Sequence, residues 1–315
     1  MSTGLNAPWS VVFRDGMPLV SERDSARILE VGEDGRAREV GVIEDVAAAG
    51  EGGLLGLAID GQGRLYAYIT TAEDNRIVRF DVDGPAGALT LGRSTILLEG
   101  LNKSTTHNGG RIAFGPDGML YASVGDAGVP KRAQDRGSLS GKILRMTADG
   151  GIPSDNPSGE SLVWSWGHRN VQGMAWADDA TMFATEFGQN TWDELNIIEP
   201  GNNYGWPVVE GIARNADFVD PVQQWSPEQA SPSGMSYRDG TLYIANLRGQ
   251  RLRTVEVSDP SQSREFFIGK YGRLRDVVPA PDGSLWIVTN NTDGRGRPQA
   301  GDDRILALSP DALDG

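Results

Sequence analysis

The sequence predicts an all-β protein, a six-bladed β-propeller made of four-stranded antiparallel blades. Three observations predict this fold class. A strand–turn–strand pattern recurs six times, each copy continues into an Arg-Ile-Leu segment or a related one, and no segment shows a sustained helical period. Asp-Gly-type turns between alternating apolar runs are a strong hairpin signal. A spacing of roughly 45–60 residues between copies leaves room for about four strands in each.

The six copies follow one another along the chain. They cover residues 9–29, 57–80, 111–145, 173–198, 234–253 and 276–306. In the first three copies, the turns between the first two strands are Asp15-Gly16, Gly61-Gln62-Gly63 and Pro116-Asp117-Gly118. In the last three copies, the corresponding turns are Asp178-Asp179, Asp239-Gly240 and Pro281-Asp282-Gly283. A lone blade cannot bury both faces of its sheet, so we expect the copies to pack into a closed ring. We expect one domain over residues 1–315; a β-sandwich with coincidental turns is the alternative.

The composition excludes several classes of function. The 315-residue chain carries a formal net charge of −14. Nucleic acid is therefore not an expected partner, because phosphate binding needs a basic face. No apolar run approaches the roughly 18–20 residues that span a bilayer. The chain has no Cys, so disulfides and thiolate metal sites are excluded. A small anion could still bind wherever arginines gather.

In a propeller, functional residues are expected where a copy departs from the repeat. The first such departure lies just before the third copy. Residues 105–111 read TTHNGGR, and His107 is one of only two His in the chain. The glycines would let the backbone approach a ligand closely. His is the usual general base near neutral pH. The alternative is a His that only hydrogen-bonds a turn.

The fourth copy departs from the repeat at both ends of its first hairpin. Arg169 and Asn170 offer a fixed cation and an amide at the start of an inner strand. A Gly-containing bend at residues 186–190 replaces the end of a regular strand. Such a bend can turn carbonyl oxygens toward a hard cation such as Ca²⁺. We expect the acidic pair Asp193 and Glu194 to form a solvated turn.

The fifth and sixth copies contribute Arg248, Arg273 and Arg275. Because side chains alternate along a strand, Arg273 and Arg275 should point to the same side. Several arginines at corresponding blade edges of an acidic protein suggest an anionic ligand, since Arg binds planar carboxylates in bidentate fashion. The alternative is that each Arg pairs with its own carboxylate, such as Asp276.

Taken in order, these motifs resemble the soluble glucose/sorbosone dehydrogenases that use pyrroloquinoline quinone (PQQ), most closely the compact aldose sugar dehydrogenases. The resemblance covers nearly the whole chain. Its most specific segments are residues 107–111 (HNGGR), 115–118 (GPDG), 167–170 (GHRN), 193–196 (DELN) and 203–207 (NYGWP).

The resemblance implies roles for individual residues. His107 would be the general base that takes the proton of the sugar's anomeric hydroxyl while hydride leaves for the quinone. Arg169 would lie beside the reactive quinone carbonyl and stabilise developing negative charge. The other implied PQQ contacts are Glu51, Asn170, Arg248, Arg273 and Arg275. The carbonyls of Gly188 and Gln189 would bind calcium beside PQQ.

Three further residues are expected at the substrate. Asp126 and Gln134 belong to a long insertion in the third copy, and Trp225 could stack on a sugar. Trp225 could equally form apolar contacts between blades.

The activity implied is oxidation of an aldose to its lactone by a PQQ- and calcium-dependent dehydrogenase that passes electrons to an external acceptor. The alternatives are a calcium-dependent propeller lactonase and a non-catalytic propeller with a decayed PQQ site. The resemblance also implies that the enzyme acts outside the cytoplasm, and that an export signal preceding Met1 has been removed. A monomer or weak dimer is expected.

Overall fold

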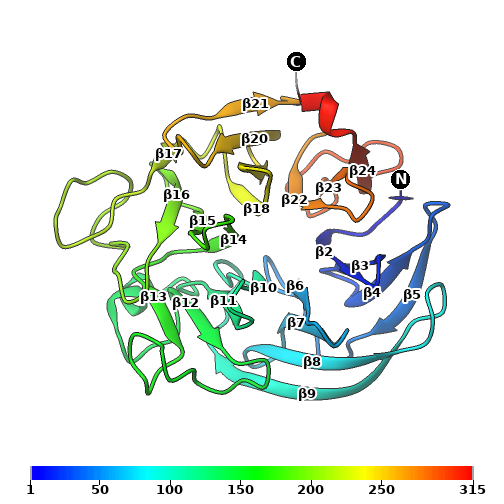
Figure 1. Ribbon diagram of the computed structural model, residues 1–315, viewed down its shortest axis with the longest axis horizontal. Helices are drawn as coiled ribbons and strands as arrows, with labels where there is room; N and C mark the ends of the chain where they lie inside the picture. The colour runs from blue at the N-terminus through cyan, green and yellow to red at the C-terminus, as the bar shows by residue number, and fades with distance from the viewer. Residues whose placement is uncertain (1, 314–315) are drawn as a thin grey trace.

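The computed structural model describes residues 2–313 and confirms the predicted fold. Six four-stranded antiparallel sheets stand around a central axis as a six-bladed propeller (Figure 1). Among these residues the helical segments are two short 3₁₀ turns, η1 (Pro130–Gln134) and η2 (Pro310–Leu313). Within the described residues, no helix has the length and apolar character that a membrane span requires.

Each of the first three blades is one continuous stretch of chain whose strands pair in sequence order. Blade 1 contains β2 (Pro8–Arg14), β3 (Met17–Glu22), β4 (Arg27–Val31) and β5 (Ala37–Val42). Blade 2 contains β6 (Leu54–Ile59), β7 (Leu65–Thr70), β8 (Asn75–Asp83) and β9 (Thr90–Leu101). Blade 3 contains β10 (Ile112–Phe114), β11 (Leu120–Val124), β12 (Lys142–Met146) and β13 (Val163–Trp166).

The next two blades repeat this order, and the last one closes the ring. Blade 4 contains β14 (Val171–Trp176), β15 (Met182–Glu186), β16 (Asp193–Ile198) and β17 (Gln223–Trp225). Blade 5 contains β18 (Pro232–Arg238), β19 (Thr241–Asn246), β20 (Arg251–Glu256) and β21 (Arg264–Phe266). Blade 6 contains β22 (Leu274–Pro279), β23 (Leu285–Thr289) and β24 (Arg304–Leu308), and its outer strand is β1 (Ser2–Thr3).

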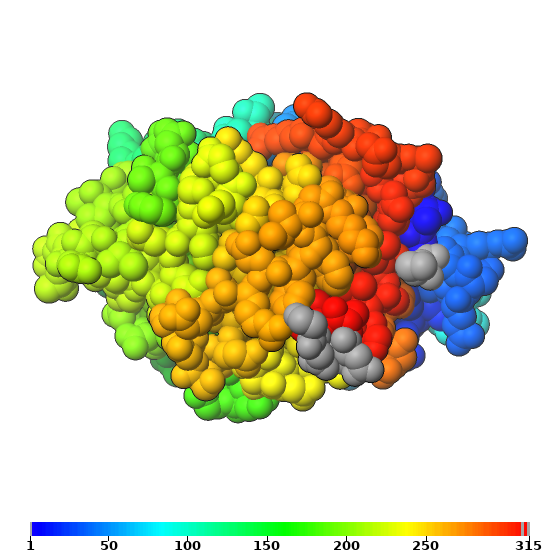
Figure 2. Space-filling view, turned by 90° about the horizontal axis from the view of Figure 1, so that it is seen from above, coloured from blue at the N-terminus to red at the C-terminus, as the bar shows by residue number. Residues whose placement is uncertain are grey.

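The ring closes by pairing the two ends of the chain. Ser2 of β1 lies opposite Ile305 of β24, and Thr3 lies opposite Arg304. Figure 2 shows the result, with the last blade in orange and red beside the blue first strands. Pairing the first strand into the last blade links the two ends of the ring by backbone hydrogen bonds and covers an otherwise free sheet edge.

Apolar residues pack between neighbouring blades, and polar residues fill the centre. One core cluster joins Tyr66 and Tyr68 of blade 2 to Leu120 and Leu144 of blade 3. The first strand of every blade lies innermost (Figure 1). These strands approach closely, since a Cβ on Gly234 would lie 1.9 Å from Asp276 Oδ1. Only glycine fits there, because a side chain would meet the backbone of Asp276 as well, at 2.8 Å from its Cα.

Candidate active site

Two kinds of loop meet around a cavity of about 450 Å³. The loops of the first kind precede the inner strands of blades 2 to 6, and those of the second kind join the second and third strands of blades 1, 4, 5 and 6. The charged and polar residues that line the cavity are Arg23, Glu51, Thr106, His107, Arg169, Gln172, Gln189, Asp193, Ser231, Arg248, Arg273, Arg275, Asp293 and Arg295. Its volume falls in the range of small-molecule sites.

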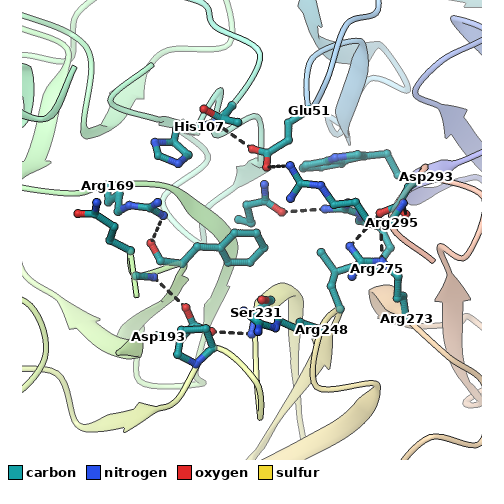
Figure 3. A pocket seen from close by; sticks show the side chains of 18 of the residues that line it. Glu51, His107, Arg169, Asp193, Ser231, Arg248, Arg273, Arg275, Asp293 and Arg295 are labelled. Atoms are coloured by element: carbon teal, nitrogen blue, oxygen red, sulfur yellow. Dashed lines mark hydrogen bonds and ion pairs between the residues drawn. The ribbon is translucent and has the colours of Figure 1, made fainter. Parts of the chain in front are cut away.

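The cavity is strongly basic although the chain as a whole is acidic. Six arginines line it together with three carboxylates, which leaves an excess of three positive charges. The chain as a whole carries a net charge of −14. Figure 3 shows His107 and Arg169 on one side of the cavity, and Arg273, Arg275 and Arg295 on the other. The geometry therefore separates a candidate base from a candidate anion site.

His107 is held in one orientation by a buried carboxylate. Its Nδ1 lies 2.8 Å from Oδ1 of Asp126, which is fully buried behind it. Burial acts to raise the pKa of Asp126, but hydrogen bonding to His107 and the charge of its imidazolium form outweigh burial and hold the pKa below its ordinary value. An ionised Asp126 keeps the proton on Nδ1 and leaves the lone pair on Nε2. The backbone of His107 is left-handed, with φ 56°, and its N–H donates to Glu51 Oε2 at 2.9 Å.

Arg169 reaches the cavity from the loop before β14. Its Nη1 donates to the carbonyl of Phe187 at 3.1 Å, and its guanidinium lies over the Trp206 ring at 5.4 Å. Burial lowers the pKa of Arg169 from its ordinary value. Its Nε is buried and has no hydrogen-bond partner within the described part of the chain. Arg169 therefore offers a partly desolvated donor beside the candidate base.

Arg273 and Arg275 both line the cavity, in agreement with the alternation of the sequence, and they have different partners. Arg273 Nη2 lies 2.9 Å from Asp293 Oδ2. Arg275 has only neutral partners, donating from Nη1 to Gln172 Oε1 at 2.8 Å and from Nη2 to Asn290 Oδ1 at 3.2 Å. Burial lowers the pKa of Arg275 to about 9. The pairing of each Arg with its own carboxylate thus holds for Arg273 and is wrong for Arg275.

Asp276, which the sequence offered as a partner for these arginines, belongs to another pair. Its Oδ2 lies 3.2 Å from Arg111 Nη1 in the buried centre of the ring. Two other arginines of the cavity, Arg248 and Arg295, lie in the loops that follow β19 and β23. Arg248 pairs with Glu228 at 2.7 Å, and Arg295 pairs with Glu51 at 2.9 Å. Both have half-exposed side chains that can turn toward a ligand.

The loop between β15 and β16 presents Gly188 and Gln189 to the cavity. The N–H of Gly188 donates to Asp193 Oδ1 at 2.8 Å, and the N–H of Gln189 donates to Glu210 Oε1 at 2.8 Å. In a trans peptide the carbonyl points opposite to the next N–H, so the Gly188 carbonyl is directed away from Glu210. The carboxylates thus fix the peptide planes of this loop.

The expectation that Asp193 and Glu194 form a solvated turn is wrong, because both side chains are buried at the start of β16. Asp193 accepts the N–H of Gly188 and, at 2.6 Å, that of Ser231, and so ties blade 4 to blade 5. Burial raises the pKa of Asp193 to about 6, against hydrogen bonds from Ser231 and Gly188 that act to lower it. Burial also raises the pKa of Glu194 to about 8.

The raised pKa of Asp193 predicts a pH dependence of stability. The folded state binds the proton more tightly than the unfolded state, whose Asp has its ordinary pKa of 3.8. The Asp193 contribution to stability is therefore full in acid and is lost as the pH rises through about 6. Relative to pH 7, protonation should add about 2 kcal/mol of stability at pH 4.5.

Urea unfolding of Asp193→Asn at both pH values measures this contribution. The stability difference between the natural chain and the variant should change by about 2 kcal/mol between pH 7 and pH 4.5. Asp45→Asn, at an exposed position, is the matched control and should show no such change. Equal pH dependence in both variants would rule out the shifted pKa.

Four residues predicted at the site do not line the cavity. Asp126 lies behind His107 and positions it. Asn170 is fully buried against the loop that precedes β10, where its Oδ1 accepts the N–H of Gly109 at 3.0 Å. Gln134 donates to the Trp206 carbonyl at 2.7 Å, outside the cavity. Trp225 is buried in the core between blades 4 and 5 under Arg253, so the alternative of apolar contacts between blades is the one observed.

Two arginines that line the cavity, Arg23 and Arg295, are not among the residues predicted from the sequence. Both lie in the loop that follows the second strand of a blade, as does the predicted Arg248. They lie one and six residues after their strands and Arg248 lies two residues after its strand, so no fixed spacing in the sequence identifies them.

Comparison with known proteins agrees with this architecture. The sequence model of the family described as Glucose / Sorbosone dehydrogenase matches residues 5–298. The aldose sugar dehydrogenase of Streptomyces coelicolor, solved in its PQQ-bound form, has 50% sequence identity and a TM-score of 0.93. That alignment covers 97% of this chain and 95% of the other.

Two curated relatives are more distant. Aldose sugar dehydrogenase YliI of Escherichia coli is 29% identical, over 92% of this chain and 89% of the relative. Quinoprotein glucose dehydrogenase B of Acinetobacter calcoaceticus is 33% identical over 69% of this chain and 53% of the relative. The resemblance seen in the sequence motifs is thereby confirmed: the chain belongs to the glucose/sorbosone dehydrogenase family.

Proposed function

We propose that this protein is a PQQ-dependent sugar dehydrogenase that oxidises the anomeric hydroxyl of aldoses to lactones and passes the electrons to an external acceptor. The observation that carries the proposal is one cavity with an Asp-oriented His on one side and an excess of arginine on the other. Membership of the family supports the sugar dehydrogenase activity. An extracytoplasmic location belongs to the same proposal.

The residues present fit a tricarboxylate such as PQQ. Arg275 is a buried cation with only neutral partners, and its Nε has no hydrogen-bond partner within residues 2–313. A buried donor without a partner costs free energy that a ligand carboxylate would recover. Arg273 and Arg248 would complete the carboxylate contacts, since both border the same cavity. The PQQ-bound structure of the Streptomyces relative supports this choice of ligand.

The chemistry can be assigned to the residues around the candidate base. Bound PQQ would supply a quinone that can accept a hydride, a proton with two electrons, from the oxidised carbon. His107 Nε2 takes the proton of the substrate hydroxyl, because Asp126 keeps the other ring nitrogen protonated. Arg169 offers a positive guanidinium where negative charge develops. Asp126 stabilises the imidazolium that forms on His107.

A calcium ion beside the cofactor would depend on backbone oxygens. The Gly188 and Gln189 carbonyls are the proposed ligands, with their loop held by Asp193 and Glu210. Among the described residues, no group of three or more His, Cys, Asp or Glu side chains is arranged to hold a metal. The proposed calcium site, made of backbone oxygens, thus differs from a lactonase site whose calcium is bound by several side chains.

Reconstitution tests the proposal. Purified apoprotein incubated with PQQ and Ca²⁺ should reduce a redox dye when aldoses are added, and should not do so with PQQ omitted. Absorbance titration should show saturable PQQ binding in the same preparation. Saturable binding without dye reduction across a panel of sugars and alcohols would favour the decayed-site alternative. No binding at all would refute the PQQ assignment.

A further inference from the structure

A second hollow of about 590 Å³ lies next to the cavity, between the loop that precedes β22 and the loop that joins β23 to β24. We call it the basic groove and define it by its five cationic side chains: Lys270, Arg273, Arg295, Arg297 and Arg304. Asp302 is the one carboxylate that lines it among the described residues. Because Arg273, Arg295 and Arg304 are paired with carboxylates, two positive charges are left over in a chain whose net charge is −14.

Two cations of the basic groove have no acidic partner. Arg304 pairs with Asp302 at 2.8 Å, while Arg273 and Arg295 pair with carboxylates of the cavity. Lys270 and Arg297 form no ion pair with the side chains of residues 2–309 and 312–313, which the structure describes. Lys270 Nζ lies 5.0 Å from the centre of the Tyr271 ring, which places its charge at the groove. The outer part of the groove is thus an uncompensated positive surface.

The basic groove leads into the cavity through shared residues. Arg273 and Arg295 line both hollows. Exposure falls along this path: Lys270 and Arg297 are exposed, the Arg295 side chain is 57% exposed and that of Arg273 is 10% exposed. Figure 3 shows the inner end, where Arg295, Arg273 and Arg275 lie together. Cationic side chains therefore follow one another from the surface to the buried arginines, and those of Arg273 and Arg295 on this path are paired with carboxylates.

We propose that the basic groove captures the trianionic cofactor and steers it into the cavity, an inference that rests on the proposed function. A chain with a net charge of −14 repels a trianion at long range. A local cluster of one sign focuses the field and raises association rates by about 10–10³-fold. Lys270 and Arg297 lie outside the cavity, so they act on the approach of the cofactor and do not hold it once bound.

Stopped-flow measurement of PQQ binding to the apoprotein tests this role. The groove variant carries both Lys270→Ala and Arg297→Ala. The matched control is Arg36→Ala with Arg93→Ala, which removes the same charge from side chains that are 90% and 81% exposed in blades 1 and 2. At low salt the groove variant should bind PQQ about three- to tenfold more slowly than the control. The difference should vanish near 0.5 M salt, where screening acts within about 5 Å.

The dissociation rate separates steering from direct contact. It should be the same in the groove variant and the control, as should kcat at saturating PQQ. A faster dissociation with unchanged association would overturn the proposal, because the two residues would then hold bound cofactor. Equal association rates in both variants would also overturn it and leave the proposed function intact. Absence of equilibrium PQQ binding in every protein would overturn both.

Discussion

Replacing His107 with asparagine should lower kcat for aldose oxidation by about 10²–10⁴-fold, the usual contribution of a general base. The affinity for PQQ should stay about the same, because the variant keeps the arginines. Asparagine is the suitable replacement, since His107 has a φ of 56° and Asn tolerates this left-handed conformation. The measurement is dye-linked turnover at saturating PQQ, with absorbance titration of the cofactor alongside.

Asp126→Asn separates the base from the residue that orients it. Asp126 accepts from His107 Nδ1 at 2.8 Å and from Trp206 Nε1 at 2.9 Å. An amide there donates as well as accepts, so it weakens the control of which imidazole nitrogen carries the proton. Turnover should fall less than in His107→Asn, with PQQ affinity unchanged. Full turnover in His107→Asn would remove His107 from the base role.

Replacing Arg275 with methionine should weaken PQQ binding by about 10²–10³-fold, or about 3–4 kcal/mol. Arg275 is the informative position because its partners Gln172, Ser233 and Asn290 are neutral. Removing Arg273 would instead leave Asp293 buried without its ion pair. Arg275→Lys should recover part of the affinity, since it keeps the charge and loses the planar fork. Absorbance titration with PQQ measures each constant.

Arg253→Met is the matched control for this loss. Arg253 is also buried, and burial lowers its pKa to about 10. Its partner Glu265, at 2.7 Å, keeps a second ion pair with Arg251 when Arg253 is replaced. It lies over Trp225, outside the cavity. Its variant should share any general effect of removing a buried guanidinium and keep normal PQQ affinity. If both variants lost affinity equally, the carboxylate role of Arg275 would be untenable.

The number and order of the blades could be predicted because their signals are local. Each hairpin can be recognised in the sequence, because its turn residues, such as Asp239-Gly240, and its alternating apolar side chains lie within a few positions of one another. The sequence motifs likewise identified the family. They also indicated the loops that carry His107, Arg169, Gly188 and Arg273, all of which line the cavity.

Several features depend on contacts between distant residues and could not be predicted. The pairing of Ser2 with Ile305 joins the two ends of the chain and has no local pattern. The sequence around Asp193 suggests a solvated turn, but the side chain is buried and accepts a hydrogen bond from the backbone N–H of Ser231 in the loop before blade 5. Trp225 lies under Arg253 in the core, because an aromatic residue of an outer strand packs on whichever neighbour the ring brings to it.

The net negative charge and the six repeats can thus be predicted from the sequence alone, whereas the basic cavity forms only when the blades come together. Arg23 lies far in sequence from Arg273 and Arg295, and no sequence pattern links the three. Ring closure brings the first and last blades together and gathers these arginines around one cavity. Their mutual repulsion is tolerated because rigid inner strands hold the loops in place and three carboxylates offset part of the charge.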